Sequence, residues 1–188
     1  SALLELGNLL RLQGEYSTAL EMFQRAWLIF EQINHPLKAI YSRLMMGRLY
    51  AYLGDSERAG RVLAPLPEEL NDFAEDSSRQ NALLGLAVYE FQLDQNERAL
   101  HYIAIGLGSL GEVGSQALRV GFLLLAGHCH SRMMQDAAAA ASFQELLDRY
   151  AEKNLSAFTA EAHAGLANLA ARQCDSATAL WHVEKILA

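Results

Sequence analysis

Apolar residues along the chain recur at intervals of three and four positions, which is the spacing of one face of an α-helix. The first such segment runs from Ala2 to Gln13, and Gly14 interrupts it. A second segment of the same kind spans Glu15–Ile33. The strict alternation of apolar and polar residues that marks a half-buried strand is not found. The pattern therefore predicts an all-α protein made of short helices joined by turns.

The pattern of small and large residues repeats every 40 positions over five units. Two columns of small residues run through the chain: Gly7, Gly47, Ala87, Gly127 and Ala167, and Ala19, Ala59, Ala99, Ala139 and Ala179. Two apolar columns accompany them: Leu6, Met46, Leu86, Ala126 and Leu166, and Phe23, Leu63, Ile103, Phe143 and Val183. Aligned columns without a gap indicate a repeat protein.

Each unit is predicted to form a hairpin of two antiparallel helices, helix A and helix B. Inside a helix, glycine lowers stability by roughly 1 kcal/mol relative to alanine. The presence of Gly7 within a predicted helix therefore requires an explanation. We expect Gly7 and Ala19 to lie where helix A crosses helix B, because only small side chains allow close approach. Phe23 should then fill the space beside them.

The units are predicted to span residues of about 1–36, 37–76, 77–115, 116–154 and 155–188, within a single domain. Pro36 should open the second unit, since proline prefers a first helical turn. Pro65 and Pro67 fall inside the second helix B, which should end or kink near Ala64 because proline removes a backbone donor. The run Gly106–Ser115 should end the third helix B in a flexible loop.

These residues resemble the tetratricopeptide repeat family. The matching positions are Leu6, Gly7, Gly14, Tyr16, Ala19, Phe23 and Ala26 in the first unit and Met46, Gly47, Tyr50, Gly54, Asp55 and Ala59 in the second. The resemblance implies a right-handed superhelix, an α-solenoid of five helix hairpins in which helices A line a concave face. The 40-residue unit is longer than the common length of about 34. In this it is similar to helical repeats in the sensor regions of bacterial signalling and transcription-regulatory proteins.

The chain departs from the family pattern in two columns. The usual tryptophan of helix A is replaced, and the positions are Leu3, Arg43, Leu83, Leu123 and His163. The turn glycine of the first two units is absent later, where Asp94, Met134 and Cys174 stand. Both departures weaken the assignment to a subfamily and leave the helical-hairpin interpretation intact.

Composition and charge narrow the classes of partner. A net charge of −7 argues against a surface that coats nucleic acid, which requires clustered Lys and Arg. The longest apolar stretches, such as Val120–Gly127, are far shorter than the roughly 18 residues needed to cross a bilayer. No secretory signal is visible, and the chain starts at Ser1 as an excised piece would. We expect a cytoplasmic protein, with no nucleic acid contacted directly by this fragment and no membrane contact.

Candidate chemistry is sparse. Three glycines spell G-x-G-x-x-G, namely Gly106, Gly108 and Gly111. A dinucleotide fingerprint follows a strand, whereas the segment before these glycines is predicted to be helical. His128 and His130 differ by about 200° around a helix axis, so they cannot ligate one ion from an intact helix. We therefore predict no catalytic residue, no cofactor, no metal site and no enzymatic activity. The enzyme alternative would be built around His128, His163 and Cys174.

Helix A residues that do not face helix B are predicted to line the concave groove. These are Asn8, Arg11, Arg48, Tyr52, Phe91, Gln92, His128, Arg132, Asn168 and Arg172. Arginine can hold a carboxylate through two hydrogen bonds, and amides can bind a peptide backbone. We predict that the groove binds a peptide or protein. The alternatives are that the arginines are ordinary solvated charges or pair with nearby Glu, or that a small-molecule effector binds in the same concavity.

The last helix carries large apolar residues with no helix after it: Leu180, Trp181, Val183, Ile186 and Leu187. An exposed apolar patch usually marks an interface. Either the natural chain continues, or another copy covers this face and makes a homo-oligomer through the C-terminal helix. We predict a non-catalytic scaffold or sensor module of a larger bacterial signalling or transcription-regulatory protein, with a self-association scaffold as the alternative.

Overall fold

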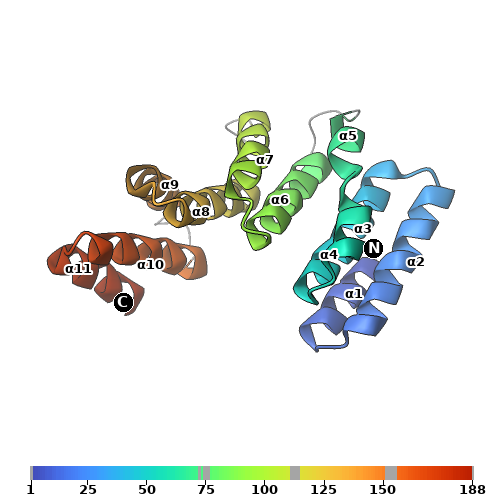
Figure 1. The fold of residues 1–188 in the computed structure, drawn as a ribbon, viewed down its shortest axis with the longest axis horizontal. Coiled ribbons are helices and arrows are strands. Elements are labelled where there is room, and N and C mark those ends of the chain that lie inside the picture. The colour runs from blue at the N-terminus through green and yellow to red at the C-terminus, as the bar shows by residue number, and fades with distance from the viewer. Residues whose placement is uncertain (1, 72, 74–76, 111–114, 151–155, 188) are drawn as a thin grey trace. The chain divides into compact units, whose positions relative to one another are not determined.

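The computed structural model describes residues 2–71, 73, 77–110, 115–150 and 156–187. Every regular element within these ranges is an α-helix, which confirms the all-α prediction. The chain divides into two compact units, Ser1–Gln92 and Leu93–Ala188. Figure 1 labels the helices of each unit in chain order.

The helices of the first unit begin and end close to the predicted positions. They are α1 (Ala2–Leu12), α2 (Tyr16–Gln32), α3 (Pro36–Tyr52), α4 (Ser56–Leu63), α5 (Leu66–Asn71) and α6 (Ser77–Gln92). Helix α2 packs on α1 and α3, and α3 also packs on α4 and α6. Pro36 opens α3, as expected. The second helix B ends at Leu63 and resumes as α5, which confirms the predicted break at the prolines.

The second unit continues the same arrangement. Its helices are α7 (Asn96–Ser109), α8 (Gln116–Arg132), α9 (Asp136–Tyr150), α10 (Ser156–Arg172) and α11 (Ser176–Leu187). Each helix packs against the next along the chain, as in a helical-repeat solenoid. The predicted unit boundaries at 76 and 154 lie outside the described residues. The grouping into five hairpins of one domain and the hand of the superhelix stay predictions.

Small residues of helix A lie against large residues of helix B, as predicted. A Cβ atom built on Gly7 would lie 2.5 Å from Cε1 of the Phe23 ring, closer than real Cβ atoms come. The same relation joins Gly47 to Leu63 and Gly127 to Phe143. Four of the five residues of the alanine column are buried too, with 0% exposure at Ala19, Ala59, Ala99 and Ala139, whereas Ala179 is partly buried. The glycines therefore permit close contact between paired helices.

Helix α7 ends inside the run Gly106–Ser115, as predicted, but not at the first glycine of the run. Helix α7 continues through Gly106 and ends at Ser109, whose Oγ donates to the Gly106 carbonyl oxygen over 3.0 Å. Gly106 is buried against the ring of Phe122 in α8, so this glycine allows close approach rather than stopping the helix. Gly106 and Gly108 therefore lie inside a helix, and the loop expected at 111–114 lies outside the described residues.

The turns that follow α1, α3, α6, α8 and α10 share one backbone feature. A residue with positive φ stands at intervals of 40, with values of 83° at Gly14, 80° at Gly54, 60° at Asp94, 58° at Met134 and 59° at Cys174. The left-handed region favours glycine, because a Cβ atom crowds the following carbonyl oxygen there. The backbone therefore adopts the same left-handed conformation in the later turns, where the residue is not glycine.

Replacing Cys174 by glycine should therefore stabilise the protein by about 0.5–1 kcal/mol, because the left-handed backbone no longer strains a side chain. The Cys174 side chain is exposed, so little packing is lost. The matched change Gly54→Ala should destabilise by about 1 kcal/mol, because it introduces that strain. Urea denaturation followed by circular dichroism measures both. A loss of stability in Cys174→Gly would show that the turn is not strained.

A pair of histidines joins α10 to α11. The Nδ1 atoms of His163 and His182 lie 2.9 Å apart, so one ring donates and the other accepts, and the acceptor must be neutral. Burial lowers the pKa of both histidines, and His182 and Lys185 lower that of His163 further. The ring of Trp181 packs edge-on against His182, with centroids 4.8 Å apart. Burial and the hydrogen bond between the two rings favour uncharged imidazoles.

Acidification from about pH 7.5 to about pH 5.5 should lower the free energy of unfolding, since unfolded histidine has a pKa of about 6.5. The unfolded chain takes up these protons first because the folded pKa values are depressed. The stabilisation is therefore present above pH 6.5 or so and is lost as the pH falls. Thermal melts of the wild type and of His182→Gln at both pH values test this. The variant should show a weaker pH dependence, and an equal one would contradict the assignment.

Candidate functional site

The first unit contains a cavity of about 300 Å³ between α1, α3 and α6. Its lining residues are Asn8, Arg11, Tyr41, Met45, Arg48, Leu49, Tyr52 and Gln92. We refer to it as the arginine pocket. It brings together five residues of the predicted groove, namely Asn8, Arg11, Arg48, Tyr52 and Gln92.

The repeat explains why these side chains converge. Asn8 and Arg48 each follow a glycine that contacts helix B. One residue along a helix turns the side chain by about 100°, which carries it off the helix–helix contact. The close glycine contact thus fixes the direction of the neighbouring polar side chain.

Arg48 carries a positive charge that no acidic side chain among the described residues matches. Its Nε atom is buried and has no hydrogen-bond partner among the described residues. Burial lowers the pKa of Arg48, and the charge of Arg11 lowers it further, whereas Tyr41 raises it. The described lining contains no aspartate or glutamate. Because a buried charge without a counter-charge is costly, the pocket favours an anionic group.

Tyr52 stands at the edge of the arginine pocket with 66% of its surface exposed. Its hydroxyl lies 3.4 Å from that of Tyr16, and the two rings are 5.5 Å apart between centroids. This hydrogen bond raises the pKa of Tyr16. Tyr52 therefore offers an open ring and a hydroxyl beside two guanidinium groups.

Three lining residues were not predicted from the sequence, and one predicted residue of the first unit lies elsewhere. Tyr41, Met45 and Leu49 come from the same face of α3 as Arg48. Helical steps of three, four and seven from Arg48 would have found Tyr41 and Met45. Phe91 is partly buried on α6 and does not line this pocket.

Three of the four predicted groove residues of the second unit, namely His128, Arg132 and Arg172, have partners within the protein. The Nε2 atom of His128 lies 3.0 Å from Oε1 of Glu161, which links α8 to α10. An Nη1 atom of Arg132 lies 3.8 Å from Asp94. Asn168 is exposed on α10.

Arg172 is held most firmly. Its Nη2 atom donates to Asp136 over 2.6 Å and to the Ser131 hydroxyl over 3.0 Å, and its Nη1 atom donates to the Ser131 carbonyl oxygen over 3.0 Å. These bonds tie α10 to the end of α8 and to the first residue of α9. Arg172 therefore fits the alternative interpretation, in which arginines of the groove pair with acidic residues, better than it fits a ligand-binding role.

A second cationic cavity of about 360 Å³ lies across α3 from the arginine pocket, since Tyr50 and Tyr52 are about 200° apart on the helix. Its lining residues are Trp27, Arg43, Tyr50, Arg58, Arg61 and Val62, and we call it the tryptophan cavity. Each of its arginines has an acidic partner. The pairs are Arg43–Glu69 at 2.7 Å, Arg58–Asp55 at 3.2 Å and Arg61–Glu57 at 3.4 Å. This cavity therefore attracts an anion less strongly.

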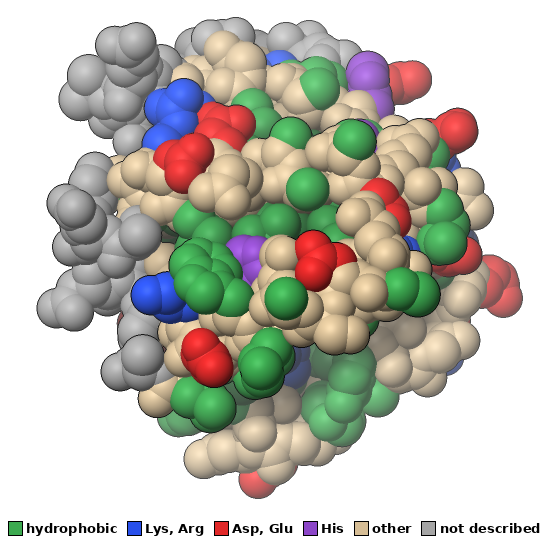
Figure 2. Space-filling model, turned by 90° about the vertical axis from the view of Figure 1, so that its left-hand side faces the viewer, with side chains coloured by type: hydrophobic (Ala, Val, Ile, Leu, Met, Phe, Trp, Pro, Cys, Tyr) green, Lys and Arg blue, Asp and Glu red, His purple; other side chains and the backbone are tan. Residues whose placement is uncertain are grey.

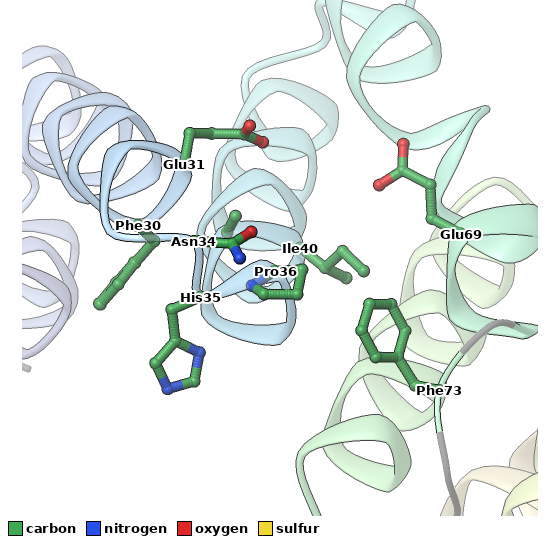
Figure 3. A pocket seen from close by; sticks show the side chains of 9 residues that line it. Phe30, Glu31, Asn34, His35, Pro36, Ile40, Glu69 and Phe73 are labelled. Carbon is green, nitrogen blue, oxygen red and sulfur yellow. The ribbon is translucent and has the colours of Figure 1, made fainter.

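A third cavity, of about 200 Å³, lies beside the turn from α2 to α3 and faces α5 (Figure 3). Two carboxylates line it, from Glu31 and Glu69. Glu31 accepts a hydrogen bond from Nε1 of Trp27 over 3.0 Å, and Glu69 pairs with Arg43. Both carboxylates are thus already satisfied, which leaves the arginine pocket as the candidate site.

Other chemistry has little support in the described part of the chain. No group of three or more His, Cys, Asp or Glu side chains there could hold a metal ion. Burial raises the pKa of the Cys129 thiol to about 11, which disfavours the reactive thiolate. Among the described helices, none combines the length and the apolar character that crossing a membrane requires.

A family model described as tetratricopeptide repeat matches residues 1–30. The match covers α1 and most of α2, the hairpin in which Gly7 contacts Phe23. It confirms the resemblance inferred from the columns of the first unit. No curated protein matches the chain. The assignment of the 40-residue unit to a longer variant stays a prediction.

Proposed function

We propose that this chain, whose first hairpin is a tetratricopeptide repeat, is a non-catalytic module that binds an acidic group of a peptide or protein in the arginine pocket. Repeats of this family are commonly protein–protein interaction modules. The observation that carries the proposal is the partly buried Arg48, which lies beside Arg11 and has no carboxylate partner in the described part of the chain.

The guanidinium and amide groups that line the pocket are arranged so that they could bind an extended peptide. Arg11 and Arg48 would hold a carboxylate by charge-assisted hydrogen bonds, which are about twice as strong as neutral ones. The amides of Asn8 and Gln92 would bind peptide groups on either side. All four side chains stand on helices, so little ordering is needed on binding.

The size of the pocket favours a peptide group over a free effector. Pockets for small molecules usually measure about 300–1,000 Å³, and the arginine pocket, at about 300 Å³, is at the lower end of this range. It has room for one acidic side chain or one chain terminus. The rest of the ligand would lie outside, where Tyr52 offers an exposed ring.

The 40-residue unit further supports a place within a larger bacterial signalling or transcription-regulatory protein. That placement rests on the resemblance alone. A pull-down from lysate of the source cells, with the arginine pocket intact or substituted, would identify the partner.

A peptide-display selection against the immobilised chain tests the binding proposal. The wild type should enrich peptides that carry an acidic residue or depend on a free carboxyl terminus. Arg48→Glu should lose this enrichment, because it reverses the charge of the pocket. Arg25→Glu is the matched control, since Arg25 is exposed on α2 and lies outside the pocket. Enrichment of the same peptides by Arg48→Glu, or of none by the wild type, would overturn the proposal.

A further inference from the structure

Two positive charges meet in the arginine pocket. Arg11 comes from α1 and Arg48 from α3, and they are close enough that the charge of Arg11 lowers the pKa of Arg48. Neither arginine forms an ion pair within the described part of the chain, and the described lining contains no aspartate or glutamate. The pocket therefore presents two positive charges to whatever group fills it.

The chain as a whole is acidic. Its net charge is −7, and Asp and Glu side chains are scattered over the face drawn in Figure 2. The arginines of the tryptophan cavity are each paired with a carboxylate, and so is Arg172. Two neighbouring arginines that share a cavity without a carboxylate contrast with this pattern. They point to a ligand that brings the missing negative charge.

The pocket also offers more hydrogen-bond donors than one carboxylate can accept. Each guanidinium has five N–H groups, and Nε of Arg48 is buried without a hydrogen-bond partner in the described part of the chain. The hydroxyl of Tyr52 accepts from Tyr16 over 3.4 Å, which leaves its own hydrogen free to donate. A carboxylate has two acceptor oxygens and one charge, whereas a phosphate monoester has three such oxygens and a charge of about −1.5 to −2 at neutral pH.

We propose that the acidic group bound in the arginine pocket is a phosphate monoester on a peptide side chain, such as phosphoserine, held between Arg11 and Arg48. This inference rests on the proposed function, because it names the acidic group that the pocket binds. A dianion matches both guanidinium charges, whereas a carboxylate leaves one of them without a counter-charge. The amides of Asn8 and Gln92 bind the peptide groups that flank the phosphorylated residue, and a free phosphate ion has no such groups.

The acidic peptides from the selection test the inference when each is synthesised with glutamate, phosphoserine or serine at the acidic position. In titration calorimetry the wild type should bind the phosphoserine form at least about tenfold more tightly than the glutamate form, because a second charge is matched. The serine form should not bind measurably. Arg11→Gln, at an exposed position, removes one of the two charges and should bring the two acidic forms close to equal affinity. Arg25→Gln, exposed on α2 and outside the pocket, should keep the full preference.

The pH dependence of binding gives a second readout, which reports the charge of the ligand. The titratable side chains of the described lining are Arg11, Arg48, Tyr41 and Tyr52, and arginine and tyrosine ordinarily titrate at about pH 10 or above. A phosphate monoester loses its second charge as the pH falls through about 6, whereas glutamate stays ionised down to about pH 4.3. Between about pH 7.5 and 5.5 the phosphoserine form should therefore lose affinity while the glutamate form keeps it.

The possible results separate this inference from the proposed function. Equal affinity for the glutamate and phosphoserine forms, or selected peptides that depend only on a free carboxyl terminus, would overturn the phosphate assignment and leave an acidic-peptide site. Failure of every form to bind would overturn both. A preference that survives in Arg11→Gln would show that the phosphate is not held between the two arginines. Inorganic phosphate that binds as tightly as the peptide, or vesicles with phosphatidylinositol phosphate that bind while the peptides do not, would show that the ligand is not a phosphopeptide.

Discussion

Gly127→Ala should lower the free energy of unfolding by about 2 kcal/mol, whereas Gly60→Ala should raise it by up to about 1 kcal/mol. Both glycines lie inside helices, where alanine is the better helix former. A Cβ atom on Gly60 meets open space, but one on Gly127 overlaps the ring of Phe143. That ring is fully buried, and Gly165 approaches its other side, where a built Cβ would be 2.5 Å from the ring. The ring therefore has no room to move away.

Urea denaturation measures the change in the free energy of unfolding of each variant, and we expect the two changes to have opposite signs. A further variant identifies the cause of this difference, because Phe143→Leu should relieve part of the overlap. The double variant Gly127→Ala/Phe143→Leu should then be more stable than the sum of the single changes allows. Strict additivity would contradict the contact between Gly127 and Phe143.

Arg48→Met should abolish ligand binding and at the same time stabilise the protein by about 1 kcal/mol. The guanidinium is partly buried with an unsatisfied Nε, and its pKa is lowered chiefly by burial. Methionine keeps the length and the apolar stem but removes the uncompensated charge. A structural arginine would give the opposite result, since its loss would leave partners unpaired.

Thermal melts and titration with an acidic peptide from the selection test both halves of this prediction. Arg25→Met is the control, because Arg25 is exposed and outside the pocket, so it should change neither property appreciably. Arg172→Met should destabilise, since that arginine bonds to Asp136 and Ser131. Loss of stability in Arg48→Met would indicate a structural role and contradict the proposed one.

Local features of the sequence predicted the hairpins well. Gly14, Pro36 and Pro65 mark the ends and starts of helices, because their backbone preferences act whatever the surroundings. The role of Gly106 was not predicted, because a glycine that stops a helix and a glycine that admits a neighbouring ring look alike in sequence. Only the position of Phe122 distinguishes them.

The candidate site was predictable in the first unit and less so in the second. Arg48 and Arg172 both lie on the predicted groove face of helix A. They differ in whether an acid from another hairpin is within reach, and Asp136 is 36 residues away from Arg172 in the sequence. Helical periodicity shows which face a side chain occupies. It does not show which side chains of other helices meet it.

The aligned columns of the repeat also gave no sign that equivalent residues differ in burial between the ends and the middle of the chain. Val183 belongs to the same column as Phe143, and Leu6 to the same column as Leu166. Phe143 and Leu166 are buried, whereas Val183 and Leu6 are more than 40% exposed, because burial depends on the neighbouring hairpin. A repeat pattern assigns the same role to every unit, so it could not predict this.

The most direct test of the account is to map the ligand site by nuclear magnetic resonance. Backbone amide shifts would be followed during titration with an acidic peptide from the selection. We predict that the perturbed amides cluster at Asn8, Arg48 and Gln92, from the three helices that line the arginine pocket. Perturbation centred instead on Trp27, Tyr50 and Arg61, across α3 in the tryptophan cavity, would contradict the account.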